Sequence, residues 1–190
     1  MLTAFGTSVT TAFAADGTLH FNSGETIAYG DYYTTRMTFD GENTAYCLEP
    51  LKKTPAAGEY EYNLLPQDSP IRKALYYLNG GYGYETITRD QCFHGWSDTD
   101  AYVIGHLTVA YIYDNYNDAG GAFYGAPQNF IDKTKEVVGV INSLPEPPIS
   151  FRAFILPAAD HQTVAGSWYE KPYGWIELYK SPANGSISDG

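Results

Sequence analysis

The 190-residue sequence is poor in cysteine, in basic residues and in long apolar runs. Its 11 Lys and Arg residues are outnumbered by 22 Asp and Glu residues, which gives a net charge of -11. Because phosphate and anionic lipids are bound by clustered Lys and Arg, this balance argues against nucleic acid and membrane surfaces as partners. No stretch reaches the ~18 consecutive apolar residues that a membrane span requires.

The shortage of cysteine and histidine bears on metal and cofactor sites. There are two cysteines, Cys47 and Cys92, and four histidines that show no ligand spacing. A zinc site needs about four such ligands in a recognisable pattern, so we expect no metal site and no cofactor. The two cysteines could instead form a disulfide if the protein is exported.

What is present is typical of one exported globular domain. Hydrophobic residues make up 44% and charged residues 17%, and there are 18 Tyr. This usage, with many Thr and Gly, indicates an extracellular protein. Residues 1–14 end in Ala12-Phe13-Ala14, an A-x-A pattern, and we interpret them as the remnant of a secretory signal peptide. A disordered N-terminal tail is the alternative.

The hydrophobic period changes twice along the chain. Short Thr- and Tyr-rich segments alternate between polar and apolar residues before Pro70 and again after Pro148, which is typical of antiparallel strands. Between these prolines the period is helical. We therefore predict an α+β fold, in which a β-rich, sandwich- or barrel-like body from 18–65 and 149–180 carries an inserted helical sub-domain with helices near 70–79, 97–114 and 128–143.

The predicted helix after Ser97 places His106 on an apolar face with four other residues, Tyr102, Val109, Ala110 and Tyr113. A histidine on such a face is commonly a core residue with a Tyr or backbone partner. The alternative is that it meets Cys47, because a neighbouring imidazole lowers the pKa of a thiol and makes it a nucleophile. The pattern around Cys47 predicts a strand, which argues against a papain-like enzyme, because those enzymes place the cysteine at a helix N-terminus.

Three segments resemble the thioester domains of Gram-positive surface adhesins and pilus-tip proteins: "AYCLEP", "RKALYYLNGGYGY" and "SDTDAYVIGHLTVAYIYDN". The resemblance covers roughly residues 19–180. It implies a mixed α/β fold and a reactive cysteine at Cys47, joined to a glutamine side chain as an internal thioester. Lysine amines of a host surface protein attack such a bond, which gives covalent adhesion.

The same resemblance implies a domain plan. Residues 15–180 would form the adhesin domain. Residues 181–190, within "LYKSPANGSISDG", resemble a linker into immunoglobulin-like stalk domains of a sortase-anchored, cell-wall-bound extracellular protein. Since the family's cysteine must stay unpaired to react, we expect Cys92 to be a free or structural thiol.

One position departs from the family pattern. The family's glutamine lies in a T-Q-x-A motif at the start of a helix, and the matching segment here is "GHLT", with His106 in the glutamine's place. A histidine has no carboxamide, so we expect that the thioester is absent unless another glutamine closes it. Gln162, in "DHQTV", lies in a predicted loop and resembles the motif only weakly, through the threonine that follows it.

Three function classes follow from these patterns. The first is an adhesin domain, covalent or not, that binds a protein on a host or neighbouring cell and is more a binding domain than an enzyme. The second is an acyltransferase or peptidase that uses Cys47 and His106. The third is a structural module of a surface fibre. The acidic, Tyr-rich composition favours the first and third, and a functional thiol–imidazole contact would favour the second.

Overall fold

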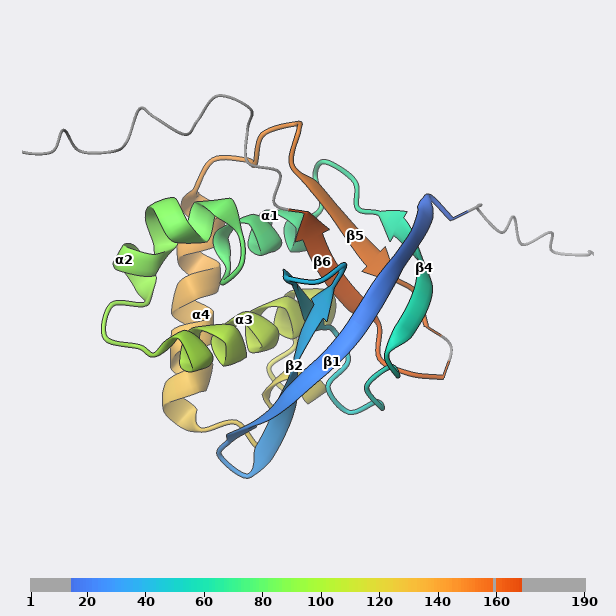
Figure 1. The fold of residues 1–190 in the computed structure, drawn as a ribbon. Coiled ribbons are helices and arrows are strands. Elements are labelled where there is room, and N and C mark those ends of the chain that lie inside the picture. The colour runs from blue at the N-terminus through green and yellow to red at the C-terminus, as the bar shows by residue number, and fades with distance from the viewer. Residues whose placement is uncertain (1–14, 159, 169–190) are drawn as a thin grey trace, which may run out of the picture.

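The computed structural model describes residues 15–158 and 160–168, and six antiparallel strands in this part form a closed barrel (Figure 1). Around the barrel the order is β1-β2-β3-β6-β5-β4, and β4 pairs back with β1. Closure leaves no unpaired sheet edge. The strands are β1 (Gly17–Tyr29), β2 (Tyr32–Phe39), β3 (Asn43–Cys47), β4 (Gly58–Leu64), β5 (Arg152–Leu156) and β6 (Val164–Trp168).

The length of β1 allows it to pair with two neighbours. Its first part, from Gly17 to Phe21, pairs with β4, and the part from Phe21 to Tyr29 pairs with β2. Between Ser23 and Thr26 the β1–β2 register shifts. A bulge of this kind bends a strand and increases its twist, which helps to close a small barrel.

Aromatic side chains fill the barrel interior. The rings of Phe39 and Phe154 meet edge to face at 4.5 Å between centroids, and both side chains are fully buried. A Cβ atom at Gly166 would lie 2.7 Å from Phe154 and 2.9 Å from Phe39. Glycine is therefore required at this point of β6, because these two rings occupy the space of a side chain. Cys47 belongs to the same interior cluster.

The helices cover one side of the barrel (Figure 1). A second core cluster joins them to Tyr46 of β3 and to Leu48, which follows this strand. Every residue of α3 from Ala101 to Ile112 is buried, as expected for a helix that is apolar all round. The helical elements are α1 (Pro70–Tyr77), a π-helical turn η1 (Tyr84–Thr88), α2 (Arg89–Cys92), α3 (Asp98–Tyr113), a 3-10 turn η2 (Gly121–Phe123) and α4 (Gln128–Ser143).

The capping residues expected from the sequence begin two of these helices. The Ser69 side chain accepts a hydrogen bond from the Arg72 backbone N–H, and Ser97 and Asp100 form a capping box at α3. The buried Arg72 guanidinium then ties α1 to the chain that leads into β5, because it donates to the backbone oxygens of Gln67, Pro148 and Phe151.

The structure confirms the predicted α+β fold and its three main helices, with two corrections. Residues 84–92, outside the three predicted helices, form η1 and α2, and residues 164–168, which no individual strand was predicted to cover, form β6. The signal-peptide remnant predicted for residues 1–14, the last part of the predicted β-rich body (169–180) and the linker predicted for 181–190 lie outside the described residues. Within the described ranges, no helix combines the length and hydrophobicity of a membrane span, and no three potential ligands gather as a metal site.

Candidate functional site

Cys47 is the last residue of β3 and faces the barrel interior, where it is 1% exposed. Its partner in the β3–β6 ladder is Val164. Burial raises the pKa of the Cys47 thiol well above its usual range, and the Glu49 carboxylate raises it further, while a hydrogen bond from the Glu49 backbone opposes both effects. The thiol is therefore protonated and shielded in the resting protein.

Gln162 lies two residues before Val164, just outside β6. The pairing continues through a hydrogen bond of 2.9 Å from the Leu48 N–H to the Thr163 oxygen. Gln162 precedes Val164 by two positions, so it is a diagonal neighbour of Cys47 on the same face, a relation that typically places such residues about 7–8 Å apart. Its side chain is buried, and its Nε2 donates to the Lys52 oxygen, but its Oε1 has no partner.

Glu49 holds the two chain segments together at this point. Its carboxylate accepts hydrogen bonds from the Thr163 backbone N–H at 3.0 Å and from the Thr163 hydroxyl at 2.7 Å, and it forms an ion pair with Lys52. Burial opposes ionisation of Glu49, but the bonds from Lys52 and Thr163 outweigh it and lower the pKa of the carboxyl group. Glu49 thus fixes the start of β6 and Gln162 relative to the end of β3.

His106 is 2% exposed on α3, and neither of its ring nitrogens has a hydrogen-bond partner in the described structure. Burial lowers the pKa of the imidazole to about 4, so the ring is neutral at physiological pH. Its nearest ring contact is Tyr29, at 6.4 Å between centroids. No hydrogen bond joins His106 to Cys47, and their direct approach stays a prediction.

His106 and Gln162 line the same cavity, of about 90 Å³, at the end of the barrel. Most of the other lining residues are polar, and none of them is acidic. They come from β2 and from the loop after β3: Tyr32, Tyr33, Thr34, Thr35, Met37, Pro50, Lys52, Lys53 and Thr54.

Unpartnered polar atoms concentrate around this cavity. Six buried side-chain nitrogen and oxygen atoms of the described residues lack a hydrogen-bond partner, and four of them belong to Tyr29, His106 and Gln162. Burial raises the pKa of the Tyr29 phenol, and a negative charge on the nearby Cys47 sulfur would raise it further. Because native proteins satisfy nearly all buried polar groups, such a cluster indicates a functional site.

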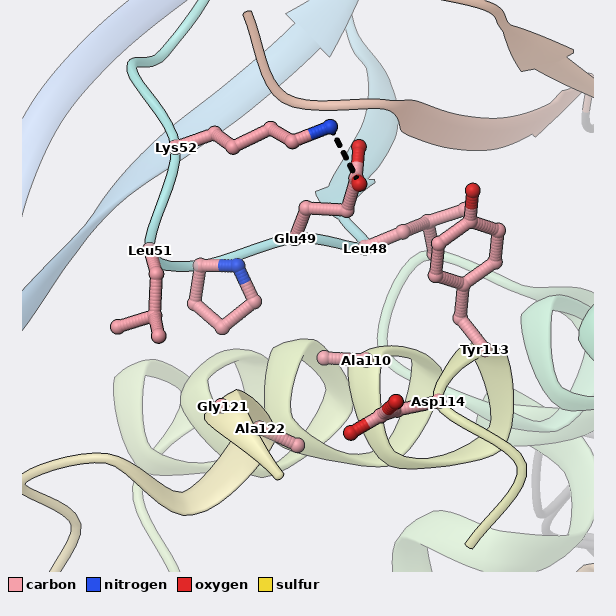
Figure 2. A pocket seen from close by; sticks show the side chains of 10 residues that line it. Leu48, Glu49, Leu51, Lys52, Ala110, Tyr113, Asp114, Gly121 and Ala122 are labelled. Carbon is pink, nitrogen blue, oxygen red and sulfur yellow. Dashed lines mark ion pairs between the residues drawn. The ribbon is translucent and has the colours of Figure 1, made fainter. Parts of the chain in front are cut away.

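A second cleft, of about 260 Å³, lies between the segment from Leu48 to Lys52 and α3 (Figure 2). Figure 2 shows the Glu49–Lys52 ion pair above it and α3 below it, with Ala110, Tyr113 and Asp114 along the helix. The remaining wall is mainly apolar and comes from Leu48, Pro50, Leu51, Gly121 and Ala122. Pro50 and Lys52 line both this cleft and the cavity of Gln162.

Comparison with known proteins agrees with this geometry. A family model for thioester domains matches residues 18–148. The chain belongs to the thioester-domain family. No curated protein matches the chain. The matched range contains Cys47 and His106 but ends before Gln162, so the position of Gln162 in this thioester domain is known from the tertiary structure alone.

Solved structures share the thioester-domain fold. The N-terminal domain of the Streptococcus pyogenes pilus tip adhesin Cpa is 14% identical, with a TM-score of 0.52, and the match covers 80% of this chain and 94% of that one. A mutant N-terminal thioester domain of a surface protein from Clostridium perfringens is also 14% identical, with a TM-score of 0.50 and coverage of 80% and 99%. At this identity the likeness shows the fold.

The sequence analysis named Cys47 and His106 as site residues and Gln162 as a possible donor, and these roles stay predictions; it did not name Tyr29. Gln162 was assigned to a loop, and it does lie just before β6, but no sequence pattern indicated that this loop borders Cys47. The Glu49 carboxylate bonds to Thr163 and Lys52 and has no hydrogen bond to His106. Cys92 is a second free, buried cysteine, at the end of α2 and in the other core cluster.

Proposed function

We propose that this thioester domain is a covalent adhesin whose acyl bond joins Cys47 Sγ to Gln162 Cδ. The observation that supports this best is the buried Gln162 carboxamide, which has an unpartnered oxygen and lies diagonally across the β3–β6 ladder from Cys47. When the bond forms, Sγ bonds to Cδ and the Cδ–Nε2 bond breaks. The thiol proton leaves with the nitrogen, so one ammonia is released.

Burial suits a thioester that must be stored. A thioester is stable until a nucleophile reaches it, and a site that excludes water slows hydrolysis. The resting Cys47 is almost fully buried, and the raised pKa of its thiol is of no consequence once the sulfur is acylated. An amine that enters the cavity attacks Cδ, displaces the sulfur and forms an amide that is far more stable than the thioester.

The proposed partner is a lysine-bearing protein on a host or neighbouring cell. The net charge of -11 favours approach of a positively charged segment. The apolar cleft beside the cavity offers contact area for residues that flank the lysine (Figure 2). This role places the domain outside the cell, on a wall-anchored Gram-positive surface protein, with stalk domains following residue 190.

Two other proposals predict a different covalent state. In a Cys47–His106 enzyme, or in an adhesin or stalk module without a thioester, Gln162 keeps its amide. The expectation that His106 has replaced the acyl donor belongs with these alternatives. The orphaned Gln162 oxygen favours the thioester, because an amide that stays intact in the core normally has partners for both of its ends.

Intact mass spectrometry of the purified domain tests the proposal. We expect wild-type protein to be lighter than its sequence by one ammonia, and methylamine to add its whole mass to that species. Gln162→Glu, which keeps the shape of the side chain, should have its full sequence mass and should not react. Wild-type protein at its full mass would refute the thioester. A mass loss that persists in Gln162→Glu would assign the acyl group to another glutamine.

A further inference from the structure

We propose that His106 accepts the proton of the attacking amine when the Cys47–Gln162 thioester acylates a partner lysine. This inference rests on the function proposed above and adds a residue to it. Its starting point is that His106 is buried on α3, lines the cavity of Gln162, and has two ring nitrogens without a hydrogen-bond partner among the described residues.

The surroundings of His106 explain why its ring can accept a proton. A buried histidine whose role is structural usually donates one N–H to a carbonyl or carboxylate, which fixes its tautomer. Here neither nitrogen is engaged. A neutral imidazole always keeps one nitrogen lone pair, so the side of the ring that faces the cavity can accept a hydrogen bond from a ligand that carries N–H groups.

The charged and titratable groups around the cavity keep this imidazole neutral before the reaction. Lys52 and Lys53 line the cavity from the loop after β3, Tyr32 and Tyr33 line it from β2, and Tyr29 contacts the ring from β1. No carboxylate lines the cavity to stabilise an imidazolium, and burial holds the pKa of His106 near 4. The lone pair is therefore available at neutral pH.

The other candidate bases are less suitable. The Glu49 carboxylate is occupied by Lys52 and Thr163, and its pKa is lowered. The Tyr29 phenol holds its proton more tightly than usual, because burial raises its pKa. Among the residues that contact or line the cavity, His106 is thus the group that is both neutral and free to accept a proton.

The proposed step is balanced in atoms and charge. The lysine nitrogen forms a bond to Gln162 Cδ, the Cδ–Sγ bond breaks, and its electron pair stays on Cys47 Sγ. One amine proton passes to His106. The thiolate that forms raises the pKa of a nearby imidazole, so this proton transfer becomes more favourable as the sulfur leaves. The proton then moves from the imidazolium to Sγ, which leaves an isopeptide, a thiol and a neutral imidazole.

The rate of methylamine addition to the intact domain tests this role. We expect His106→Gln to form the thioester, seen as the loss of one ammonia, but to react with methylamine on the order of 100-fold more slowly than wild type, the usual size of a general-base effect. Thr108→Val is the matched control. It removes another buried, unpartnered polar atom from α3, away from the cavity residues, and should react at the wild-type rate.

A solvent isotope effect separates proton transfer from a purely structural role. Wild-type protein should react more slowly in D₂O, and His106→Gln should lose most of this difference. A thioester-bearing His106→Gln that reacts at the wild-type rate would overturn the proposal, as would a folded variant that keeps its ammonia, since His106 would then act in thioester formation. If the variant does not fold, wild-type protein with no isotope effect would overturn it equally. Wild-type protein at full mass would instead refute the thioester itself.

Discussion

Cys47 and Cys92 are both free and both buried, but their surroundings differ in kind. Cys47 ends β3 inside the barrel, with the Gln162 carboxamide diagonally across the ladder. Cys92 ends α2 in the helical cluster, where burial raises the pKa of its thiol, the Glu136 carboxylate adds to this and Lys133 opposes it. Burial alone therefore does not mark a reactive cysteine. What distinguishes Cys47 is Gln162, which lies two residues before its ladder partner Val164 and lines a cavity.

The largest expected difference between the two cysteines is in labelling by an amine. Cys47→Ala should abolish incorporation of a fluorescent primary amine, because no sulfur remains to hold the acyl group. Cys92→Ala should be labelled like wild type. Fluorescence of the denatured protein on a gel measures both. Labelling that is lost in Cys92→Ala, with the fold intact, would contradict the assignment of Cys47 as the reactive residue.

The region around Cys47 and His106 should also lose more stability in acid than the region around Cys92. Since the pKa of His106 is about 4 when folded and about 6.5 when unfolded, the unfolded chain binds its proton first as the pH falls. This contribution to stability is present above pH 6.5 and is lost on the way to pH 4, by about 3 kcal/mol.

Urea denaturation at pH 7, 5 and 4 measures this loss in the free energy of unfolding. His106→Gln should flatten the pH dependence. His94→Gln, at an exposed position two residues after Cys92, should keep the wild-type dependence. Identical curves for wild type and His106→Gln would show that the ring is not buried in its neutral form.

Two helical glycines, one against the residue before Cys47 and one in open space on α4, differ in how much room they leave for a side chain. At Gly105 of α3, a Cβ atom would lie 2.7 Å from the Tyr46 hydroxyl and 2.9 Å from its ring, and Tyr46 is fully buried beside Cys47. We expect Gly105→Ala to cost about 1–3 kcal/mol through overpacking. Gly139→Ala on α4 meets nothing within 4 Å and should stabilise the helix by about 0.5–1 kcal/mol. Thermal midpoints that fall equally would contradict this.

The smallest effect is expected next to Cys92. The Lys133 ammonium donates to the Cys92 backbone oxygen at 2.9 Å and pairs with Glu136 at 2.8 Å. Lys133→Met keeps most of the apolar stem, so we expect a loss of about 1 kcal/mol or less and no change in amine labelling. Slower labelling in this variant would mean that the contacts around Cys92 influence the reactivity of the thioester.

The sequence by itself determined the local elements. Ser97 predicted the start of α3 correctly, because helix caps are local interactions between residues three positions apart. The change of hydrophobic period predicted the α+β class. The motifs around Cys47 indicated the thioester-domain family, which the family match confirms.

The tertiary structure decided where Gln162 lies. Glu49 and Thr163 are 114 positions apart, and no local pattern encodes which distant segments pair. β6 was missed because its sequence, VAGSW, is short and contains a glycine, which is typical of a loop. Gly166 leaves room for the rings of Phe39 and Phe154, which come from two other strands. Barrel closure and the shared cavity of His106 and Gln162 depend on such non-local packing, which is only satisfied once the whole chain has folded.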